Sequence, residues 1–264
     1  MAAIELRLAI FLALFAVIAL SEFAWPRRAS ERGQRWITNF GLLLLNTALL
    51  RLASFALPAL TVAAAFGAER WQLGLLPALK LPDAVAFVAA FVALDLAIYG
   101  QHVAMHAVPA LWRMHRVHHA DATLDVTTGL RFHALEILLS QVWKIGVIIL
   151  LGVPVMAALV FEIVLNASSM FAHANLNLPS GVERWLRLVL VTPDMHRVHH
   201  SVERDEHDTN YGFNLSLWDR LFATYRAQPR APYETMAIGL TGITQGEARN
   251  FAAMLCFPFV RGVS

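Results

Sequence analysis

Four long apolar stretches constrain the fold of this chain more than any other feature. They cover residues 8–20, 37–66, 84–100 and 137–170, and few strongly polar residues interrupt them. A helix crosses a membrane with about 20 predominantly apolar residues. The mean hydropathy of +0.54 is also high for a water-soluble domain. The sequence therefore predicts an all-α integral membrane protein with about four to five membrane helices.

The first apolar stretch is interpreted as a retained membrane span and not as a cleaved signal peptide. A signal peptide begins with a basic segment and ends at a small-residue cleavage site. Here Arg7 stands alone beside Glu5, and no A-x-A sequence follows residue 20.

The charged residues between the apolar stretches predict how the chain crosses the membrane. Four arginines lie within 22–36, whereas 67–82 carries only Arg70 and Lys80. Because cytoplasmic loops are rich in Lys and Arg, we expect 22–36 in the cytoplasm and 67–82 outside. The third stretch then returns the chain, so 101–135 is expected in the cytoplasm.

The last apolar stretch is too long for one crossing and carries a helix breaker near its middle. Gly152 and Pro154 lie in the sequence GVP, and glycine and proline together end or kink a helix. The sequence predicts a helical hairpin at 137–171, with arms at 137–151 and 155–171. Each arm of roughly 16 residues is about 24 Å long, enough for a short crossing.

The remainder of the chain, 176–264, is less apolar and is predicted to form a cytoplasmic, histidine-rich helical cap. Its last apolar segment, 251–260, is expected on the membrane surface or on the cap. No linker rich in Pro, Gly or Ser divides the chain, so 1–264 is expected to form a single membrane-embedded domain.

Charge and composition exclude some partners and suggest a compartment. The net charge is only +2, which gives no sign of a nucleic-acid partner. Of the 21 Lys and Arg residues, only Lys80 and Lys144 are lysines. This bias is typical of GC-rich genomes, so we expect a bacterial inner membrane.

Histidines form the most unusual pattern in the chain. The hexapeptide MHRVHH occurs twice, at 114–119 and 195–200, and a third pair lies in HVAMH at 102–106. Residues three or four apart share one face of a helix, so each H-x-x-H-H group aims its imidazoles together. Eight imidazoles at one membrane face exceed what one ion binds. The pattern predicts a dinuclear metal site held by His102, His106, His115, His118, His119, His196, His199 and His200.

The three remaining histidines are less clear from the sequence. His173 follows Glu162, Asn166 and Ser169 at helical spacing, and this polar stripe favours a ninth ligand. His133 is predicted equally well as a ligand or as a support for one. His207 lies in an acidic run and is interpreted as an ordinary polar residue.

Supporting residues are expected because each ligand imidazole is oriented through its other nitrogen. Asp95 is the strongest candidate, since a carboxylate inside a membrane span is costly and usually functional. It lies seven residues before His102, on the same predicted helix face. The further candidates are Glu136, Asn177, Asp208 and Asn210.

The ligand type leaves the metal open. Imidazole suits iron, zinc, copper and nickel. Cys256 is the only cysteine, which excludes an internal disulfide and a multi-thiolate zinc site. A metal carrier or sensor without catalysis is the alternative, but transport would need ligands along a path through the membrane. A bis-histidine haem protein would need paired histidines in facing helices.

The sequence resembles the fatty acid hydroxylase / sterol desaturase superfamily over about residues 90–226. The resemblance rests on the three histidine motifs followed by DTNYGFNLSLWDRLFATY, and on RFHALE at 131–136 and HANLN at 173–177. Asn177 stands where some members of the superfamily have a further histidine. By motif, the eight clustered histidines match ligand positions, and His173 matches an additional one.

This resemblance implies a non-haem dimetal centre, normally two Fe ions, although zinc can replace iron on isolation. It implies O₂ as co-substrate and hydroxylation or desaturation of a lipid or sterol-like substrate. The electrons would come from a separate reductase, ferredoxin or cytochrome.

Overall fold

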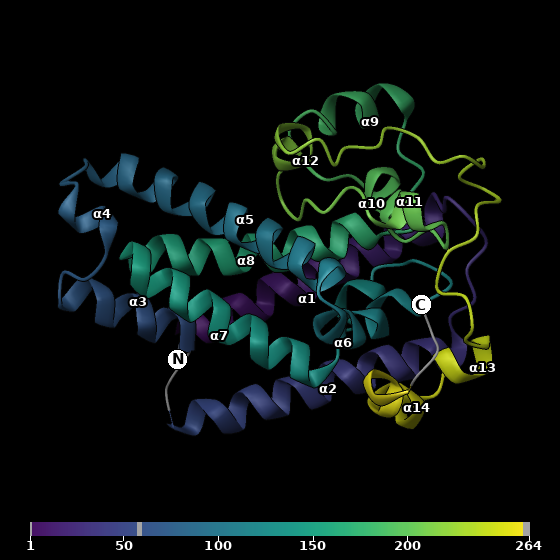
Figure 1. Cartoon of the computed structure of the whole chain (residues 1–264), viewed down its shortest axis with the longest axis horizontal. Helices are drawn as coiled ribbons and strands as arrows, with labels where there is room; N and C mark the ends of the chain where they lie inside the picture. The colour runs from purple at the N-terminus through teal and green to yellow at the C-terminus, as the bar shows by residue number, and fades with distance from the viewer. Residues whose placement is uncertain (1, 57–59, 261–264) are drawn as a thin grey trace.

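The computed structural model describes residues 2–56 and 60–260 and consists of helices joined by turns and loops (Figure 1). No β-strand occurs in this part of the chain; three isolated bridges are the only pairing of extended residues. The predicted all-α class is therefore confirmed.

Among the described residues, six longer helices form the body of the molecule. Three of them are long and apolar enough to cross a membrane. They are α5 (Asp83–Ala107), α7 (Ala134–Leu151) and α8 (Val155–His173). Their outer faces expose large apolar side chains such as Val88, Val142 and Leu150, which is what a lipid-facing surface requires. These three helices account for three of the four to five membrane helices that the sequence predicts.

The other long helices are α1 (Ala2–Ala24), α2 (Gly33–Ala56) and α3 (Leu60–Arg70). In α1 the apolar part is the shorter Leu8–Ala24. The apolar stretch 37–66 is divided between α2 and α3, and 57–59 lie outside the described residues.

The predicted helical hairpin is confirmed. α7 ends at Leu151, Gly152 adopts a left-handed conformation with φ 67°, and α8 begins after Pro154. The turn before α4 (Leu75–Ala78) packs directly on this corner. The backbones are so close that a Cβ on Gly152 would overlap the carbonyl oxygen of Leu73. Glycine is therefore required here for its backbone angle and for its small size.

We expect Gly152→Ala to destabilise the protein by at least about 1–2 kcal/mol, because a left-handed residue with a Cβ is strained. The overlap with Leu73 adds to this cost. Gly146→Ala is the matched control: it lies within α7, and the position that its new methyl group would take has nothing within 4 Å. Thermal unfolding in detergent should show a lower Tm for the first variant only. Equal effects of the two would contradict the close approach of the two turns.

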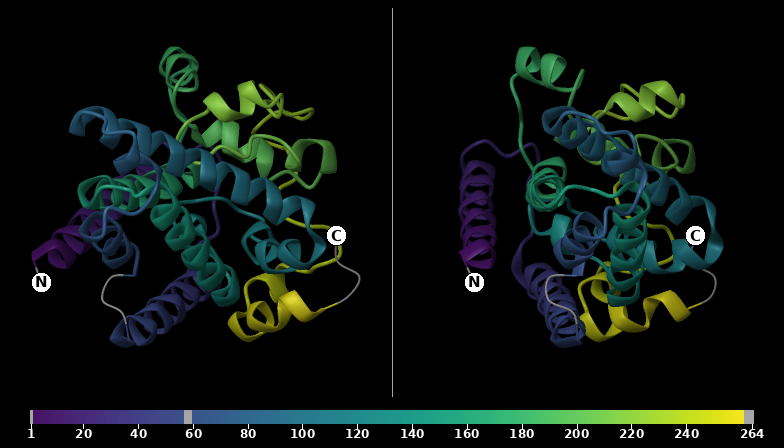
Figure 2. Two further views of the ribbon diagram at one scale, coloured as in Figure 1. Left: turned by 60° about the vertical axis from the view of Figure 1, so that its left-hand side comes forward. Right: turned by 90° about the vertical axis from the view of Figure 1, so that its left-hand side faces the viewer.

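Short helices gather at the end of the bundle where α5 and α8 finish and α7 begins (Figure 1). Figure 2 shows α1 on one flank of the bundle, apart from the C-terminal helices. These short elements are α6 (Pro109–His119), η1 (Thr128–Leu130), α9 (Ser180–Leu186), α10 (Pro193–His199), α11 (Arg204–His207), α12 (Leu217–Leu221), α13 (Gln245–Ala248), α14 (Phe251–Cys256) and η2 (Phe257–Phe259). The last apolar segment packs on the protein: α14 contacts α2, and η2 contacts α6.

Candidate metal centre

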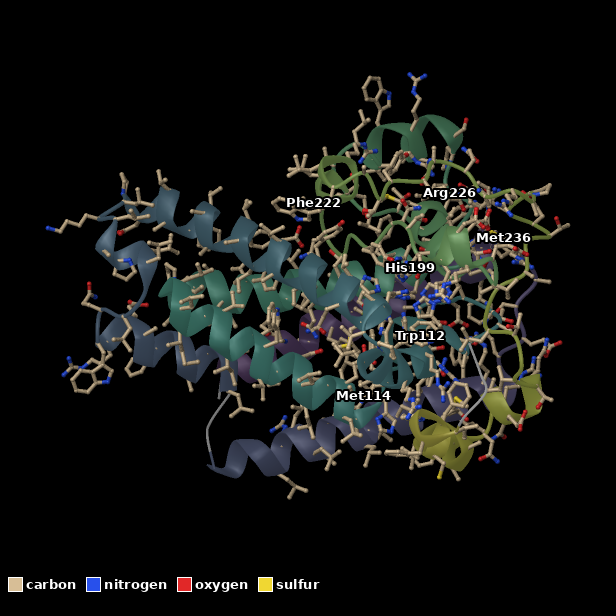
Figure 3. All side chains as sticks on the ribbon, viewed as in Figure 1. Trp112, Met114, His199, Phe222, Arg226 and Met236 are labelled. Carbon is tan, nitrogen blue, oxygen red and sulfur yellow. The ribbon has the colours of Figure 1, made fainter. Side chains whose placement is uncertain are left out.

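The nine predicted ligands come together between the long helices and the cap. The end of α5 supplies two of them, α6 three, the last residue of α8 one, and α10 with its C-cap three. All nine are buried, with at most 8% of their surface exposed. In Figure 3 the nitrogen atoms of this cluster gather beside the labelled His199 and Trp112. Helices distant in sequence therefore deliver imidazoles to one place.

The nine histidines divide into two groups that could each hold a metal ion. Within a group, one nitrogen of each imidazole lies within 4.8 Å of the others. The first group is His102, His106, His115, His119 and His199. The second group is His118, His173, His196 and His200.

The two copies of MHRVHH contribute to both groups. In α6, His115 and His119 are four residues apart and join the first group, whereas His118 joins the second. In α10 the assignment is reversed: His199 joins the first group, and the i, i+4 pair His196 and His200 joins the second. Residues i and i+4 share a helix face, so each motif presents two imidazoles to one point and one to the other. Each copy of MHRVHH therefore supplies ligands to both histidine groups.

Close nitrogen–nitrogen distances fit ligands around a shared cation. The Nε2 atoms of His102 and His119 each lie 3.2 Å from Nε2 of His115. Nε2 of His173 lies 2.9 Å from those of His118 and His196. Two nitrogens bound at right angles to an ion, each about 2.0–2.1 Å from it, are about 3 Å apart.

Two further imidazole nitrogens point to the same conclusion. Nε2 of His106 and Nε2 of His199 are buried and have no hydrogen-bond partner among the described residues. A buried polar atom without a partner is unfavourable unless something else binds it. The donor set and these orphaned nitrogens fit a metal ion.

Six of the imidazoles are oriented through their Nδ1 atoms. His115 Nδ1 donates to Oε1 of Glu136 at 2.6 Å, and His106 Nδ1 lies 3.4 Å from Oδ1 of Asp208. A donating Nδ1–H leaves the Nε2 lone pair free for the centre. The other four donate to backbone carbonyls: His102 to Tyr211, His118 to Arg131, His173 to Ser169 and His199 to Thr209.

Burial keeps the cap imidazoles in the form that binds metal. It lowers the pKa well below the usual value for the histidines of α6 and α10, and neighbouring imidazoles lower it further. A neutral imidazole is a ligand and a protonated one is not. The residues concerned are His118, His119, His196, His199 and His200.

The predicted supporting residues occupy different places. Glu136 and Asp208 contact ligand imidazoles, as described above. Asp95 is buried and accepts from Nε1 of Trp218 at 2.8 Å and from the Leu215 amide, so it fastens α5 to α12. Asn210 donates to the carbonyls of Met195 and Arg226, and this ties the segment after α11 to α10.

Three residues lie outside both groups. His133 is the N-cap of α7, where its Nδ1 accepts from the Leu135 amide at 3.2 Å. His207 packs against Trp112 and, with the buried His106 and the partly buried Asp208, forms a third cluster at the edge of the first group. Asn177 contacts the Arg27 side chain on the cap surface.

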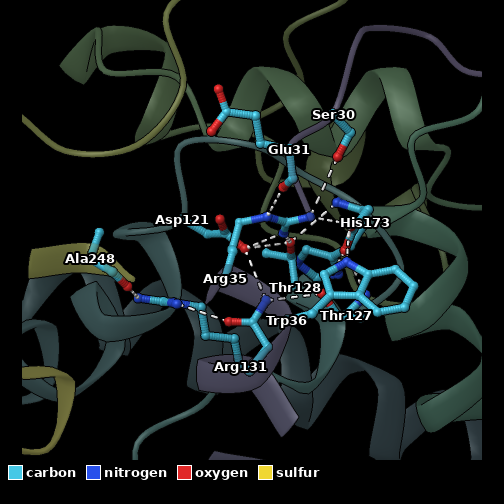
Figure 4. A network of polar contacts seen from close by, with 12 residues as sticks. Ser30, Glu31, Arg35, Trp36, Asp121, Thr127, Thr128, Arg131, His173 and Ala248 are labelled. Carbon is cyan, nitrogen blue, oxygen red and sulfur yellow. Dashed lines mark hydrogen bonds and ion pairs between the residues drawn. The ribbon is translucent and has the colours of Figure 1, made fainter. Parts of the chain in front are cut away.

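A buried polar network beside the second group was not anticipated (Figure 4). Arg35 of α2 forms ion pairs with Asp121, at 2.8 Å, and with Asp125. Burial alone would raise the pKa of Asp121, but the charges of Arg35 and Arg131 hold it below its usual range. Arg131 is fully buried, and its guanidinium binds the Val117 carbonyl of α6. The charged residues Asp121, Asp125 and Arg131, which follow the first MHRVHH closely, are the feature of the sequence that could have predicted this network.

A cavity of about 300 Å³ lies between α1, α2, α5, α7 and α8 and reaches the first group. His102 and His115 are part of its wall, whereas no histidine of the second group is. Much of the remaining wall is apolar: Leu43, Leu50, Ile98, Leu130, Ile137 and Leu165. The arrangement can hold an apolar molecule against one of the two groups.

The sequence model for fatty acid hydroxylase matches residues 87–224, a span that includes all nine of these histidines. The chain belongs to the fatty acid hydroxylase family. It is 31% identical to the ornithine lipid hydroxylase OlsE of Rhizobium tropici, over 96% of this chain and 75% of that protein.

The alkylglycerol monooxygenases of Homo sapiens and Danio rerio are 30% and 32% identical over 58% and 56% of this chain. The chain spans about a third of the length of either, 32% in both cases. No solved structure gives a significant match. Membership of this family confirms the predicted resemblance and the prediction of an oxygenase, and the carrier without catalysis is not favoured.

Proposed function

We propose that this membrane protein is an O₂-dependent lipid hydroxylase whose metal centre is held by the nine histidines. The observation that carries the proposal is the cavity that connects an apolar space between membrane helices to His102 and His115. A lipid can enter such a space from the bilayer while its reacting carbon lies next to the first group. The two relatives named hydroxylase and monooxygenase support the same reaction class.

The cofactor is proposed to be two Fe ions, one in each histidine group. Iron bound in this way would supply the reductive activation of O₂. Imidazole also suits zinc, so protein isolated from overexpressing cells is expected to carry some zinc in its place. In the overall reaction a C–H bond becomes C–OH, one oxygen atom leaves as water, and two electrons and two protons are consumed. A separate reductase, ferredoxin or cytochrome is proposed as the electron donor.

The residues of the chain hold and enclose the reactants. Glu136 and the backbone carbonyls fix the imidazoles, and the apolar wall excludes water from the reacting carbon. Hydroxylation and desaturation would use the same ligands. We propose hydroxylation because the two relatives are named a hydroxylase and a monooxygenase, and both names denote the insertion of oxygen.

We further propose a bacterial inner membrane with the histidine groups on the cytoplasmic side. The arginines of 22–36, which lie at the same end of the bundle as the histidines, support this orientation. A reporter fused at Val153 should be periplasmic, and one at Gln228 cytoplasmic. Both reporters on one side would contradict the topology.

The direct test combines metal content with turnover. Protein purified in mild detergent should contain about two metal ions per chain by inductively coupled plasma mass spectrometry. With a chemical or enzymatic reductant, bacterial lipid extract and ¹⁸O₂, a lipid should gain one ¹⁸O atom. A di-iron preparation that consumes O₂ without labelling any lipid would contradict the proposed function.

Glu136, which binds His115, should contribute more to metal affinity than Asp208, which contacts His106. The Glu136–His115 contact is 2.6 Å and buried, whereas the Asp208–His106 contact is 3.4 Å and 36% of the Asp208 side chain is exposed. We expect Glu136→Leu to weaken metal binding at the first group about 10–100-fold. Asp208→Ala is the matched control with a smaller effect, and competition with a metal chelator measures both. A larger loss in Asp208→Ala would contradict this ranking.

A further inference from the structure

Two short helices of the cap, α9 and α12, expose apolar side chains although neither helix is a membrane span. On α12, Leu217 and Leu221 lie four residues apart and share one helix face, whereas Trp218 and Asp219 are buried. On α9, 64% of Trp185 is exposed. The exposed set on these helices and the residues next to them includes Val182, Trp185, Val189, Leu217, Leu221 and Phe222. We call these six side chains the α9–α12 face.

Backbone contacts join the two parts of this face into one surface. The Ser216 amide donates to the Val189 carbonyl at 3.0 Å, and the Arg220 guanidinium donates to the Arg187 carbonyl at 2.6 Å. Figure 1 shows α9 next to α12, on the side of the bundle where α5 lies. An exposed apolar surface of this extent marks a place where a soluble or membrane-bound protein contacts something other than water.

Contacts with α5 place α12 at the depth of the bilayer. The Trp218 indole donates to Asp95 at 2.8 Å, and the Phe222 ring stacks on Tyr99 with centroids 5.4 Å apart. Asp95 lies about 18 Å along the helix axis from Asp83, where α5 begins, and Tyr99 about 24 Å. The hydrocarbon layer is about 30 Å thick, and a tilt of α5 shortens both distances along the membrane normal. α12 is therefore fastened to α5 within the leaflet on the histidine side.

The charges around the face suit a lipid headgroup layer. Glu183 and Asp219 are the only carboxylates in 180–191 and 214–225, and both are buried. Arg184 is exposed, and its guanidinium lies over the Trp185 ring at 5.2 Å. Tryptophan is enriched where headgroups meet hydrocarbon, and cationic side chains beside an apolar surface bind anionic lipids.

We propose that the α9–α12 face lies in the lipid–water interface of the leaflet on the histidine side. Its apolar side chains contact acyl chains, and Arg184 lies among the headgroups. A bilayer is the partner because the face continues the lipid-facing side of α5, where Leu96 is exposed beside the buried Asp95. The inference requires that α5 crosses the bilayer and does not depend on the proposed reaction.

This lipid contact would hold a helix that supports the metal centre. Asp219 of α12 accepts hydrogen bonds from the amides of Tyr211 and Gly212, at 2.7 and 2.8 Å. The Tyr211 carbonyl in turn accepts from Nδ1 of His102, a ligand in the first group. The cap is thus attached to the bilayer close to the loop that orients one of its imidazoles.

Site-specific fluorescence quenching tests the proposal in a bilayer. Cys256 is the only cysteine, so Cys256→Ser gives a background without thiols. In this background, Val189→Cys and, separately, Leu221→Cys are labelled with bimane in nanodiscs of phosphatidylcholine and phosphatidylglycerol. Val142→Cys on the exposed side of α7 calibrates contact with lipid, and Glu203→Cys on the cap calibrates contact with water.

The two quenchers are a nitroxide-labelled phosphatidylcholine and aqueous iodide. We expect the nitroxide lipid to quench the labels at 189 and 221 about as strongly as the label at 142. Iodide should quench them at least about threefold less than the label at 203, because an interfacial apolar face is shielded from water. Metal content equal to that of the unmodified protein shows that each variant is folded, and Val182→Cys replaces a variant that loses metal.

Two results would overturn the proposal. Strong iodide quenching without nitroxide quenching at both positions would place the face in water. Weak quenching by both reagents would mean that protein covers it, such as a second copy of the chain. Since neither measurement involves turnover, a failure of lipid hydroxylation would leave this result unchanged.

Discussion

His118→Ala is expected to abolish lipid hydroxylation and to remove one of the two bound metal ions. His118 is one of only four imidazoles in the second group, and its Nε2 lies 2.9 Å from that of His173. The five imidazoles of the first group do not include it, so that ion should remain. Because the two sites act as a unit, we expect activity to fall by on the order of 10³-fold or more. Metal analysis and ¹⁸O₂ labelling of lipid on the same sample measure the two effects.

His133→Asn is the matched control for this substitution. His133 is also a buried histidine near the centre, but it belongs to neither group and caps α7. Asparagine is a good N-cap, so this variant should keep two ions and most of the activity. Both variants should insert into the membrane, since each alters one side chain outside the apolar spans. Full metal content or retained turnover in His118→Ala would contradict the assignment of the second group.

The sequence was sufficient for the parts of the fold that depend on local pattern. The GVP turn predicted the α7–α8 hairpin because glycine and proline act through their own backbone angles. The spacing of MHRVHH predicted convergent imidazoles, since helical periodicity decides which residues share a face. These inferences needed no knowledge of how distant segments pack.

The division of ligands between two groups could not be predicted from spacing. It depends on how α6 and α10 face each other, and only the structure shows that His118 and His199 cross to the opposite groups. Most of the groups that orient the imidazoles are backbone carbonyls, such as those of Tyr211 and Thr209. Every residue has a carbonyl, so no pattern of side chains marks them. Asp95 illustrates the limit: its helix face was predicted, but its partner Trp218 lies 123 residues away.

The buried network of Figure 4 links α2, the segment after α6 and the second histidine group. Arg35 pairs with Asp121 and Asp125, and Thr128 donates to Asp121 at 2.8 Å. Gly129, the next residue, accepts a hydrogen bond from Ser169, whose carbonyl in turn holds His173. The arginine therefore supports the loop on which part of the second group rests.

Arg35→Leu is expected to destabilise the protein by about 3–5 kcal/mol, because it leaves two buried carboxylates without their cation. The side chains of Asp121 and Asp125 are at most 1% exposed, so water cannot replace the guanidinium. For a chain of this size the loss corresponds to a decrease in Tm of roughly 10 °C. Thermal unfolding in detergent measures it, and metal analysis should show preferential loss from the second group.

Arg249→Ala is the matched control for Arg35→Leu, because Arg249 is a nearby arginine whose ion pair faces water. Arg249 pairs with Glu31, whose side chain is 74% exposed, and such a pair contributes less than about 1 kcal/mol. Its Tm should therefore remain within a few degrees of the unmodified protein. The Tm of Arg35→Lys should lie between those of Arg35→Leu and Arg249→Ala. A lysine keeps the positive charge but lacks the planar guanidinium that binds both carboxylates. If Arg35→Leu unfolds at the same temperature as Arg249→Ala, the network does not stabilise the loop that holds the second metal group.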